Sequence, residues 1–167
     1  LLKGKSHYFR REYDSAVLIF NQLVQDEGFN QEARYWLALC KWRDLKPQPA
    51  INDLKNLIEE VDSEEFMSRI YLSLGEIYLS IDNSEDAYNN FNKGANLSKN
   101  RLLREQVYFQ IAEISFENSD FDNALESYQK VLSNTVSITR IQDSNLKIVQ
   151  IYRLRGELEK SANRIQE

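Results

Sequence analysis

The segment Leu74-Gly75-Glu76-Ile77-Tyr78, followed by Ala87 and Phe91, decides the fold class of this chain. It contains a small residue in one apolar stretch and a second small residue twelve positions later, and this pattern recurs along the sequence. The first small positions are Gly4, Ala38, Gly75, Ala112 and Val149, and the second are Ala16, Ala50, Ala87, Ala124 and Ser161. Both sets advance by 34, 37, 37 and 37 residues. Two sets of small positions that keep one register through five copies indicate an internal repeat.

Each copy has the pattern of two helices joined by a short turn. Apolar residues recur at helical spacing, as in Ile70, Leu74 and Ile77, and the polar run 82–84 then interrupts them. A small residue on one helix lets the partner helix approach closely. With only 5 Gly and 2 Pro in 167 residues, the composition also favours helices over a turn-rich sandwich or barrel. Because a single helix pair cannot bury its apolar face alone, neighbouring copies must stack.

The quoted segment resembles the signature of the tetratricopeptide repeat, in which L-G-x2-Y is followed by A and F. Other copies resemble it in part: Ala112 follows Ile111, but Ser115 stands in the Tyr place. The resemblance implies an all-α, right-handed helical-hairpin solenoid of about five repeats in a single domain over 1–167. The repeats are predicted at 1–30, with the start missing, 31–67, 68–104, 105–141 and 142–167, the last incomplete. Copies two to four carry three extra residues, which predicts longer second helices or longer loops.

Composition excludes several classes of function. The net charge is −5, with 26 acidic against 21 basic residues, and no basic stripe is present, so nucleic acid is not an expected partner. One Cys and one His exclude a disulfide framework and a zinc site built by the chain, and no cofactor is expected. No apolar run is long enough for a membrane-spanning helix in this fragment. Since the chain begins at Leu1 without Met, we expect it to be part of a longer protein.

The resemblance implies a protein partner, because tetratricopeptide proteins bind peptides or helices on a concave groove formed by the first helix of each repeat. Relative to the first small residue, the groove is predicted at three positions before it and one, four and five after it. The predicted partner-binding residues are Tyr8, Tyr35, Leu39, Trp42, Arg43, Leu72, Glu76, Leu79, Phe109, Glu113, Phe116 and Glu117, with Lys5 and Phe9 on the same face of the first copy. Tyr, Trp and Arg are typical interface anchors. An apolar floor with an acidic rim suits a peptide with hydrophobic anchors and Lys or Arg.

Three alternatives accompany this hypothesis. The aromatic residues Trp42 and Phe116 pack between neighbouring first helices instead of binding a ligand. Cys40 and His7 are the one pairing that resembles a nucleophile and base, but a packed Cys behaves as a small hydrophobe, so no catalytic residue and no enzyme activity are predicted. The third alternative is self-assembly into a homo-oligomer through an uncapped C-terminal end, at Leu154, Leu158, Ala162 and Ile165.

The sequence leaves the compartment open. The stretched repeats resemble those of bacterial cell-envelope scaffolds, which favours the periplasm. A chain with a single Cys is equally compatible with the cytoplasm.

Overall fold

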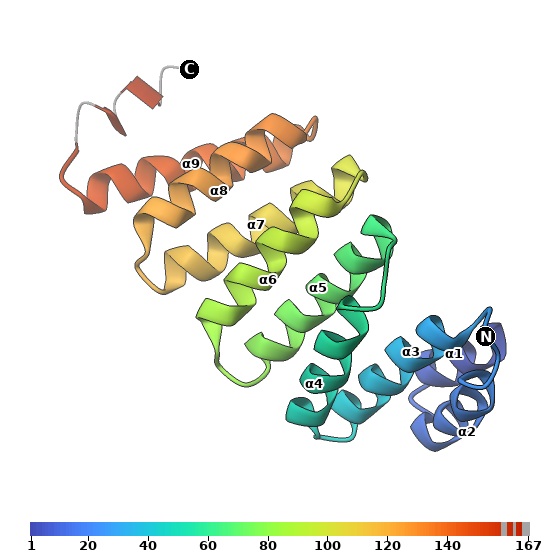
Figure 1. The fold of residues 1–167 in the computed structure, drawn as a ribbon. Helices are drawn as coiled ribbons and strands as arrows, with labels where there is room; N and C mark the ends of the chain where they lie inside the picture. Colours follow the sequence, from blue (N-terminus) through green and yellow to red (C-terminus); the bar gives the residue numbers. More distant parts are fainter. Residues whose placement is uncertain (158–159, 162, 165–167) are drawn as a thin grey trace. The chain divides into compact units, whose positions relative to one another are not determined.

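The computed structural model describes residues 1–157, 160–161 and 163–164, and within them every regular element is an α-helix (Figure 1). Within each of the first four hairpins the two helices run in opposite directions (Figure 1). The helices are α1 (Leu2–Phe9), α2 (Tyr13–Leu23), α3 (Asn30–Arg43), α4 (Pro47–Ile58), α5 (Glu64–Leu79), α6 (Ser84–Leu97), α7 (Arg101–Glu117), α8 (Phe121–Asn134) and α9 (Ile138–Leu154). The all-α helical-repeat fold class is therefore confirmed.

The chain divides into two compact units, Leu1–Asn90 and Phe91–Glu167, with the division inside α6. In the first unit, α3 packs against both second helices α2 and α4, and also contacts the next first helix α5. In the second unit, α8 packs against both α7 and α9. Each unit therefore stacks successive hairpins as the repeat requires.

The small positions that define the repeat are buried in every copy. Ala16, Ala50, Ala87 and Ala124 have no exposed surface, and Ser161 is 4% exposed. Gly4, Ala38, Gly75, Ala112 and Val149 are buried as well. Bulky neighbours fill the space beside them, since Phe20 and Tyr128 are also fully buried. The small positions that repeat along the sequence are thus the positions where the helices pack closely.

The turn between the two helices of each copy holds a residue with left-handed backbone conformation. Arg11, Leu45, Asp82 and Ser119 have φ between 57° and 64°, and Gly156 has φ 73°. These positions follow the repeat spacing, since each lies seven residues after a first small position. The backbone closes the first helix of each copy with the hydrogen bonds of a Schellman motif, such as Lys46 N to Lys41 O at 3.0 Å. This shared turn fixes the direction in which each second helix starts.

The extra residues of the longer copies lengthen helices, and the loops between copies become shorter. The second helices α6 and α8 extend ten residues beyond Ala87 and Ala124, whereas α2 extends seven beyond Ala16. Helices α5, α7 and α9 start at Glu64, Arg101 and Ile138, each four residues before its predicted repeat boundary. Side chains of Ser63, Asn100 and Ser137, spaced by 37 residues, cap these starts by accepting backbone N–H bonds. Of the two predicted alternatives, longer second helices are observed in α6 and α8 and longer loops are not, because the capped first helices start earlier than expected.

Candidate functional site: the first-helix groove

A hollow of about 310 Å³ lies on the face formed by the first helices α1, α3 and α5 of the first unit, and we call this face the first-helix groove. The hollow brings together predicted site residues from all three helices: Tyr8, Tyr35, Leu39, Trp42, Arg43, Leu72 and Glu76. Its other lining residues are Phe9, Trp36, Arg69 and Ser73. Leu79, also predicted, is half-buried and does not line this hollow.

The floor and the rim of this hollow differ in exposure. Tyr35, Leu39 and Tyr8 are between 4% and 8% exposed, so they form a rigid floor that also belongs to the core. Trp42 and Leu72 are half-buried at its wall. Phe9 is 71% exposed, although its ring packs edge-on against Trp36 with centroids 5.7 Å apart. An aromatic ring held in place yet open to solvent is the type of group that anchors a partner.

Hydrogen bonds between neighbouring first helices hold the groove side chains in place. The Tyr35 and Ser73 hydroxyls lie 2.8 Å apart, Trp42 Nε1 donates to Ser80 Oγ at 3.0 Å, and Arg43 Nε donates to the Tyr8 hydroxyl at 3.2 Å. The Arg43 guanidinium also stacks 4.0 Å from the Trp42 ring centroid. Trp42 therefore both links two first helices and lines the hollow.

Two carboxylates on this face have opposite electrostatic environments. Burial by itself raises the pKa of Glu32, but the hydrogen bond from Arg69 and the charges of Arg69 and Lys5 hold that pKa below its usual range. Trp36 Nε1 donates to the same carboxylate at 3.1 Å.

Glu76 is exposed and lines the hollow, and its carboxylate has no hydrogen bond or ion pair with any described residue. The surrounding side chains still desolvate its carboxylate enough to raise its pKa, despite the opposing charge of Arg43. Glu76 thus presents to the hollow a carboxylate that lacks a direct partner.

The structure adds positions to this face that the four predicted offsets missed. Trp36 and Ser73 lie two residues before the small position of their copy, and Glu32 and Arg69 lie six before it. These offsets are one helical turn apart and extend the predicted stripe toward the helix start. A wider stripe would have found them in the sequence.

Cations from one first helix cover aromatic rings of a neighbouring first helix in both units. Lys5 Nζ lies 5.3 Å from the Trp36 ring centroid, and the Arg69 guanidinium lies 4.9 Å from that of Tyr35. In the second unit, the Arg140 guanidinium lies 3.9 Å from the Phe109 centroid. Much of the aromatic stripe that the sequence displays is therefore used in contacts between repeats.

Internal contacts occupy most of the predicted groove residues of the second unit. Phe109 and Phe116 pack against the buried cluster around Tyr128, and Lys147 Nζ lies 4.5 Å from the Phe116 centroid. Glu113 accepts hydrogen bonds from Tyr128 and from Lys147, the latter at 3.0 Å. Glu117 is exposed. Phe116 thus packs as the alternative hypothesis expects, whereas Trp42 packs and also lines the first-helix groove.

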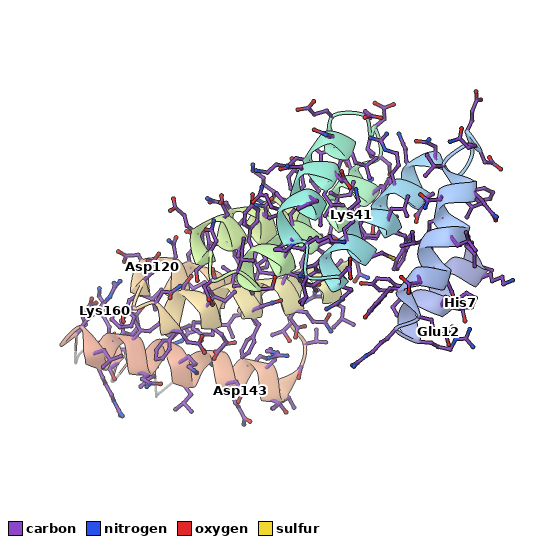
Figure 2. The ribbon with its side chains drawn as sticks, turned by 90° about the horizontal axis from the view of Figure 1, so that it is seen from below. His7, Glu12, Lys41, Asp120, Asp143 and Lys160 are labelled. Carbon is purple, nitrogen blue, oxygen red and sulfur yellow. The ribbon has the colours of Figure 1, made fainter. Side chains whose placement is uncertain are left out.

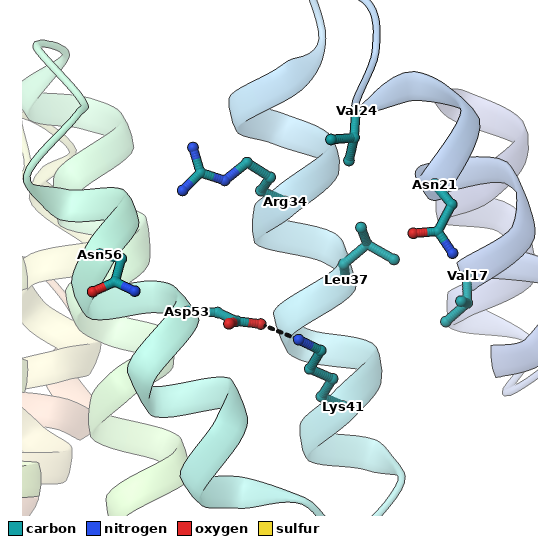
Figure 3. A pocket seen from close by; sticks show the side chains of 8 residues that line it. All are labelled: Val17, Asn21, Val24, Arg34, Leu37, Lys41, Asp53 and Asn56. Atoms are coloured by element: carbon teal, nitrogen blue, oxygen red, sulfur yellow. Dashed lines mark hydrogen bonds and ion pairs between the residues drawn. The ribbon is translucent and has the colours of Figure 1, made fainter.

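A second hollow, of about 430 Å³, lies on another stripe of α3, between α2 and α4 (Figure 3). Its apolar part comes from Val17, Val24 and Leu37. Lys41 and Asp53 form an ion pair across it at 2.5 Å, and Arg34, also in its lining, pairs with Glu60 outside it. Because its charged groups already have partners, this hollow offers less to a charged ligand than the first-helix groove.

Cys40 and His7 do not form a nucleophile–base pair in the described part of the chain. His7 Nδ1 lies 2.5 Å from Glu12 Oε2, and both residues are labelled in Figure 2. The Cys40 thiol is buried, and burial raises its pKa to about 11. Among the described residues, no cluster of three His, Cys, Asp or Glu side chains has the arrangement of a metal site.

The described helices contain no candidate membrane span, because none is both long and apolar enough. At the C-terminal end, Leu154 is 60% exposed. The other residues predicted to form an assembly surface there, Leu158, Ala162 and Ile165, lie outside the described residues.

Known proteins share both the repeat and the fold. The tetratricopeptide repeat profile matches residues 68–101 and 105–134. The crystal structure of MamA has 18% sequence identity to this chain and a TM-score of 0.70, and the alignment covers 98% of this chain and 90% of MamA. A tetratricopeptide protein from Thermus thermophilus is 18% identical with a TM-score of 0.58, covering 96% and 84% of the two chains. Naa15/Naa10 bound to HypK-THB gives 16% identity and a TM-score of 0.78, covering 98% of this chain and 23% of the other.

No curated protein sequence matches the chain. The sequence match to two repeats and the shared fold of the described helices agree with the register of the small residues. Residues 68–101 and 105–134 therefore match the tetratricopeptide repeat, and the described helices share the fold of a solved tetratricopeptide-repeat protein.

Proposed function

We propose that this chain is a scaffold that binds a peptide or helix of a partner protein in the first-helix groove of its first unit. The tetratricopeptide fold supports a protein–protein interaction scaffold in general. The observation that carries the groove proposal is the hollow of about 310 Å³, where side chains of three successive first helices meet beside the exposed Phe9 ring.

The rigidity of the groove favours binding. Tyr35, Leu39 and Tyr8 are locked in the core, so a ligand that packs on them orders few new side chains. Phe9 at the rim and Leu72 at the wall supply apolar surface. Preorganised aromatic surface reduces the conformational entropy lost on association. We therefore place the hydrophobic anchor of the ligand between Phe9, Trp42 and Leu72.

The charge of Glu76 gives the ligand a second feature. Its carboxylate lines the hollow without an ion-pair partner among the described residues. A Lys or Arg beside the hydrophobic anchor would neutralise it, and a neutral ligand would leave it desolvated and unpaired. Glu76 thus forms the acidic rim that the sequence predicts in this proposal. Glu113 does not contribute, because Lys147 already neutralises it.

Panning a displayed library of random peptides on the purified chain tests the proposal. An enriched peptide is synthesised with a fluorescent label, and its Kd is measured by fluorescence polarisation. Phe9→Ala should weaken binding by roughly tenfold, because the ring lines the hollow. Phe29→Ala is the matched control, since Phe29 is 42% exposed and lies outside the hollow.

Circular dichroism must show the same helicity for both variants and the wild type. Equal loss of affinity in the two variants, or enrichment of no peptide, would contradict groove binding. If an enriched peptide binds the Phe9→Ala variant with unchanged affinity, the ligand binds another surface.

A further inference from the structure

The edge of the first-helix groove opens into a further hollow of about 500 Å³, at the turn between α1 and α2. Its lining is two arginines, Arg11 and Arg43, and three aromatic residues, Tyr8, Phe9 and Tyr13. Tyr8, Phe9 and Arg43 also line the hollow that Glu76 borders, so the two hollows share a wall. A ligand lying in the groove therefore has direct access to both.

No carboxylate among the described residues forms an ion pair with Arg11 or Arg43. The Arg11 side chain has no hydrogen bond within the described part, and Arg43 bonds only the Tyr8 hydroxyl and stacks on Trp42. Glu76 acts on Arg43 through its charge and makes no direct bond to it.

The carboxylates next to the two arginines in the sequence are already occupied. Glu12 pairs with His7 and Arg10, and Asp44 pairs with Lys46 at 2.5 Å. Both carboxylates therefore pair with cations that do not line the hollow.

Several other arginines of the chain have a carboxylate partner, although Arg101, Arg104 and Arg153 form no ion pair among the described residues. Arg34 pairs with Glu60, Arg140 with Glu105 and Arg155 with Asp122, at 2.5, 3.5 and 2.7 Å. In a chain with 26 acidic and 21 basic residues, carboxylates are in excess. Two arginines that meet in one hollow without a direct carboxylate partner leave a local excess of positive charge.

Backbone and packing hold both arginines at the hollow. Arg11 sits at φ 64° in the Schellman turn, where its N–H donates to Tyr8 O at 2.9 Å. Arg43 ends α3, and its side chain is held between the Trp42 ring and the Tyr8 hydroxyl. A guanidinium bonded through Nε keeps its two terminal nitrogens as donors for an anion.

We infer that the hollow of Arg11 and Arg43 receives an acidic side chain, Asp or Glu, of the same partner segment whose hydrophobic anchor occupies the groove. This inference rests on the proposed function and specifies its ligand. Charge-assisted hydrogen bonds from two guanidinium groups match a carboxylate. The partner segment then carries an acidic residue on the Arg11 side and a basic residue beside Glu76.

The peptides enriched by panning provide the test. We expect an Asp or Glu at one fixed distance from the hydrophobic anchor. In the labelled peptide, Glu→Gln at that position should weaken binding roughly fivefold, and added salt should weaken the parent peptide more than the Gln peptide. Arg11→Gln should reproduce the loss with the Glu peptide and have no effect with the Gln peptide.

A charge swap separates contact from a structural effect. Arg11→Glu should bind the peptide with Lys in place of Glu more tightly than the wild-type chain does. Arg153→Glu is the matched control, because this exposed arginine does not line the hollow. Arg43→Gln is a second variant, read only if its helicity is unchanged, since it also removes the bond to Tyr8.

The outcomes distinguish the two proposals. Enriched peptides without an acidic residue, or equal effects of Arg11→Gln on the Glu and Gln peptides, overturn the carboxylate site while groove binding stands. Two results together support both proposals: Phe9→Ala loses peptide binding, and Arg11→Glu binds the Lys peptide more tightly than the wild-type chain does. Absence of any enriched peptide overturns the proposed function and this inference with it.

Discussion

The ring of Phe20 fills the space directly above the backbone of Gly4. A Cβ added at Gly4 would lie 2.5 Å from Phe20 Cε1, and Phe20 has no exposed surface into which it can move. This contact is one instance of the small-and-bulky pairing that the repeat encodes. It gives a physical reason for Gly in the first copy, where the second and fourth have Ala.

Gly4→Ala should therefore destabilise the chain by roughly 1–3 kcal/mol, although Ala is the better helix former, because the added methyl overpacks a filled site. Urea unfolding followed by circular dichroism measures the change. Gly28→Ala is the control, since its Cβ would meet only the Asp26 carboxylate oxygen at 3.3 Å on the surface. Equal stability of the two variants would show that Phe20 yields without cost.

Leu45→Gly should stabilise the chain by roughly 0.5–1 kcal/mol. Leu45 has φ 57° and is 90% exposed, so the substitution removes left-handed strain and very little packing. Thermal unfolding measures the gain. Leu45→Ala keeps a Cβ and should show no increase in Tm; an equal increase would mean that the exposed leucine itself, and not its backbone conformation, limits stability.

Glu32→Gln and Glu76→Gln should change stability in opposite directions at pH 7. The folded pKa of Glu32 is lowered, so its contribution is present above the ordinary value of 4.5 and is lost as pH falls through the lower folded pKa. Glu32→Gln removes this stabilisation and should be less stable than the wild type at pH 7.

The folded pKa of Glu76 is raised, so its charged form destabilises the fold above that pKa. Glu76→Gln should be more stable than the wild type at pH 7, and this difference should shrink as pH falls through the raised pKa and toward 4.5. Urea titrations at a series of pH values measure both variants. A loss of stability in Glu76→Gln at pH 7 would show that Glu76 is held by partners in solution and is not available to a ligand.

Phe116→Ala should destabilise the chain by roughly 1–3 kcal/mol, because its half-buried ring packs against the Tyr128 cluster and beneath Lys147. Leu146→Ala on α9 should change stability by less than about 0.5 kcal/mol, since that side chain is 68% exposed. Urea unfolding compares the two. A neutral Phe116→Ala would return Phe116 to the set of residues available for a ligand.

Cys40 should react slowly with a thiol-specific reagent in the folded chain and rapidly in denaturant. The thiol is 2% exposed and its pKa is raised to about 11, so little thiolate forms at neutral pH. Absorbance of the released chromophore at pH 8 measures both rates. A fast native reaction would indicate local opening of α3 and would revive Cys40 as a candidate nucleophile.

The sequence alone determined the repeat, the helical class and the positions of close packing, because these depend on residue size at fixed spacing. Gly4 and Ala16, with their equivalents in the other copies, could be identified without coordinates, and each is buried. Turn positions such as Leu45 and Asp82 were not predicted to adopt left-handed backbone, since neither is the glycine that this conformation favours. Their register became visible only in the helix-closing hydrogen bonds.

Only the tertiary structure decided which groove side chains are free. Periodicity placed Glu76 and Glu113 at equivalent positions. Glu113 pairs with Lys147 and accepts a hydrogen bond from Tyr128, whereas the Glu76 carboxylate has no such partner among the described residues. Trp42 and Phe116 differ in the same way, one lining a hollow and the other packed against a core. A repeat fixes the face on which a side chain lies, whereas its charge partners come from neighbouring helices whose residues vary from copy to copy. Arg11 and Arg43 meet for that reason too, across a turn and a helix end that are 32 residues apart in the chain.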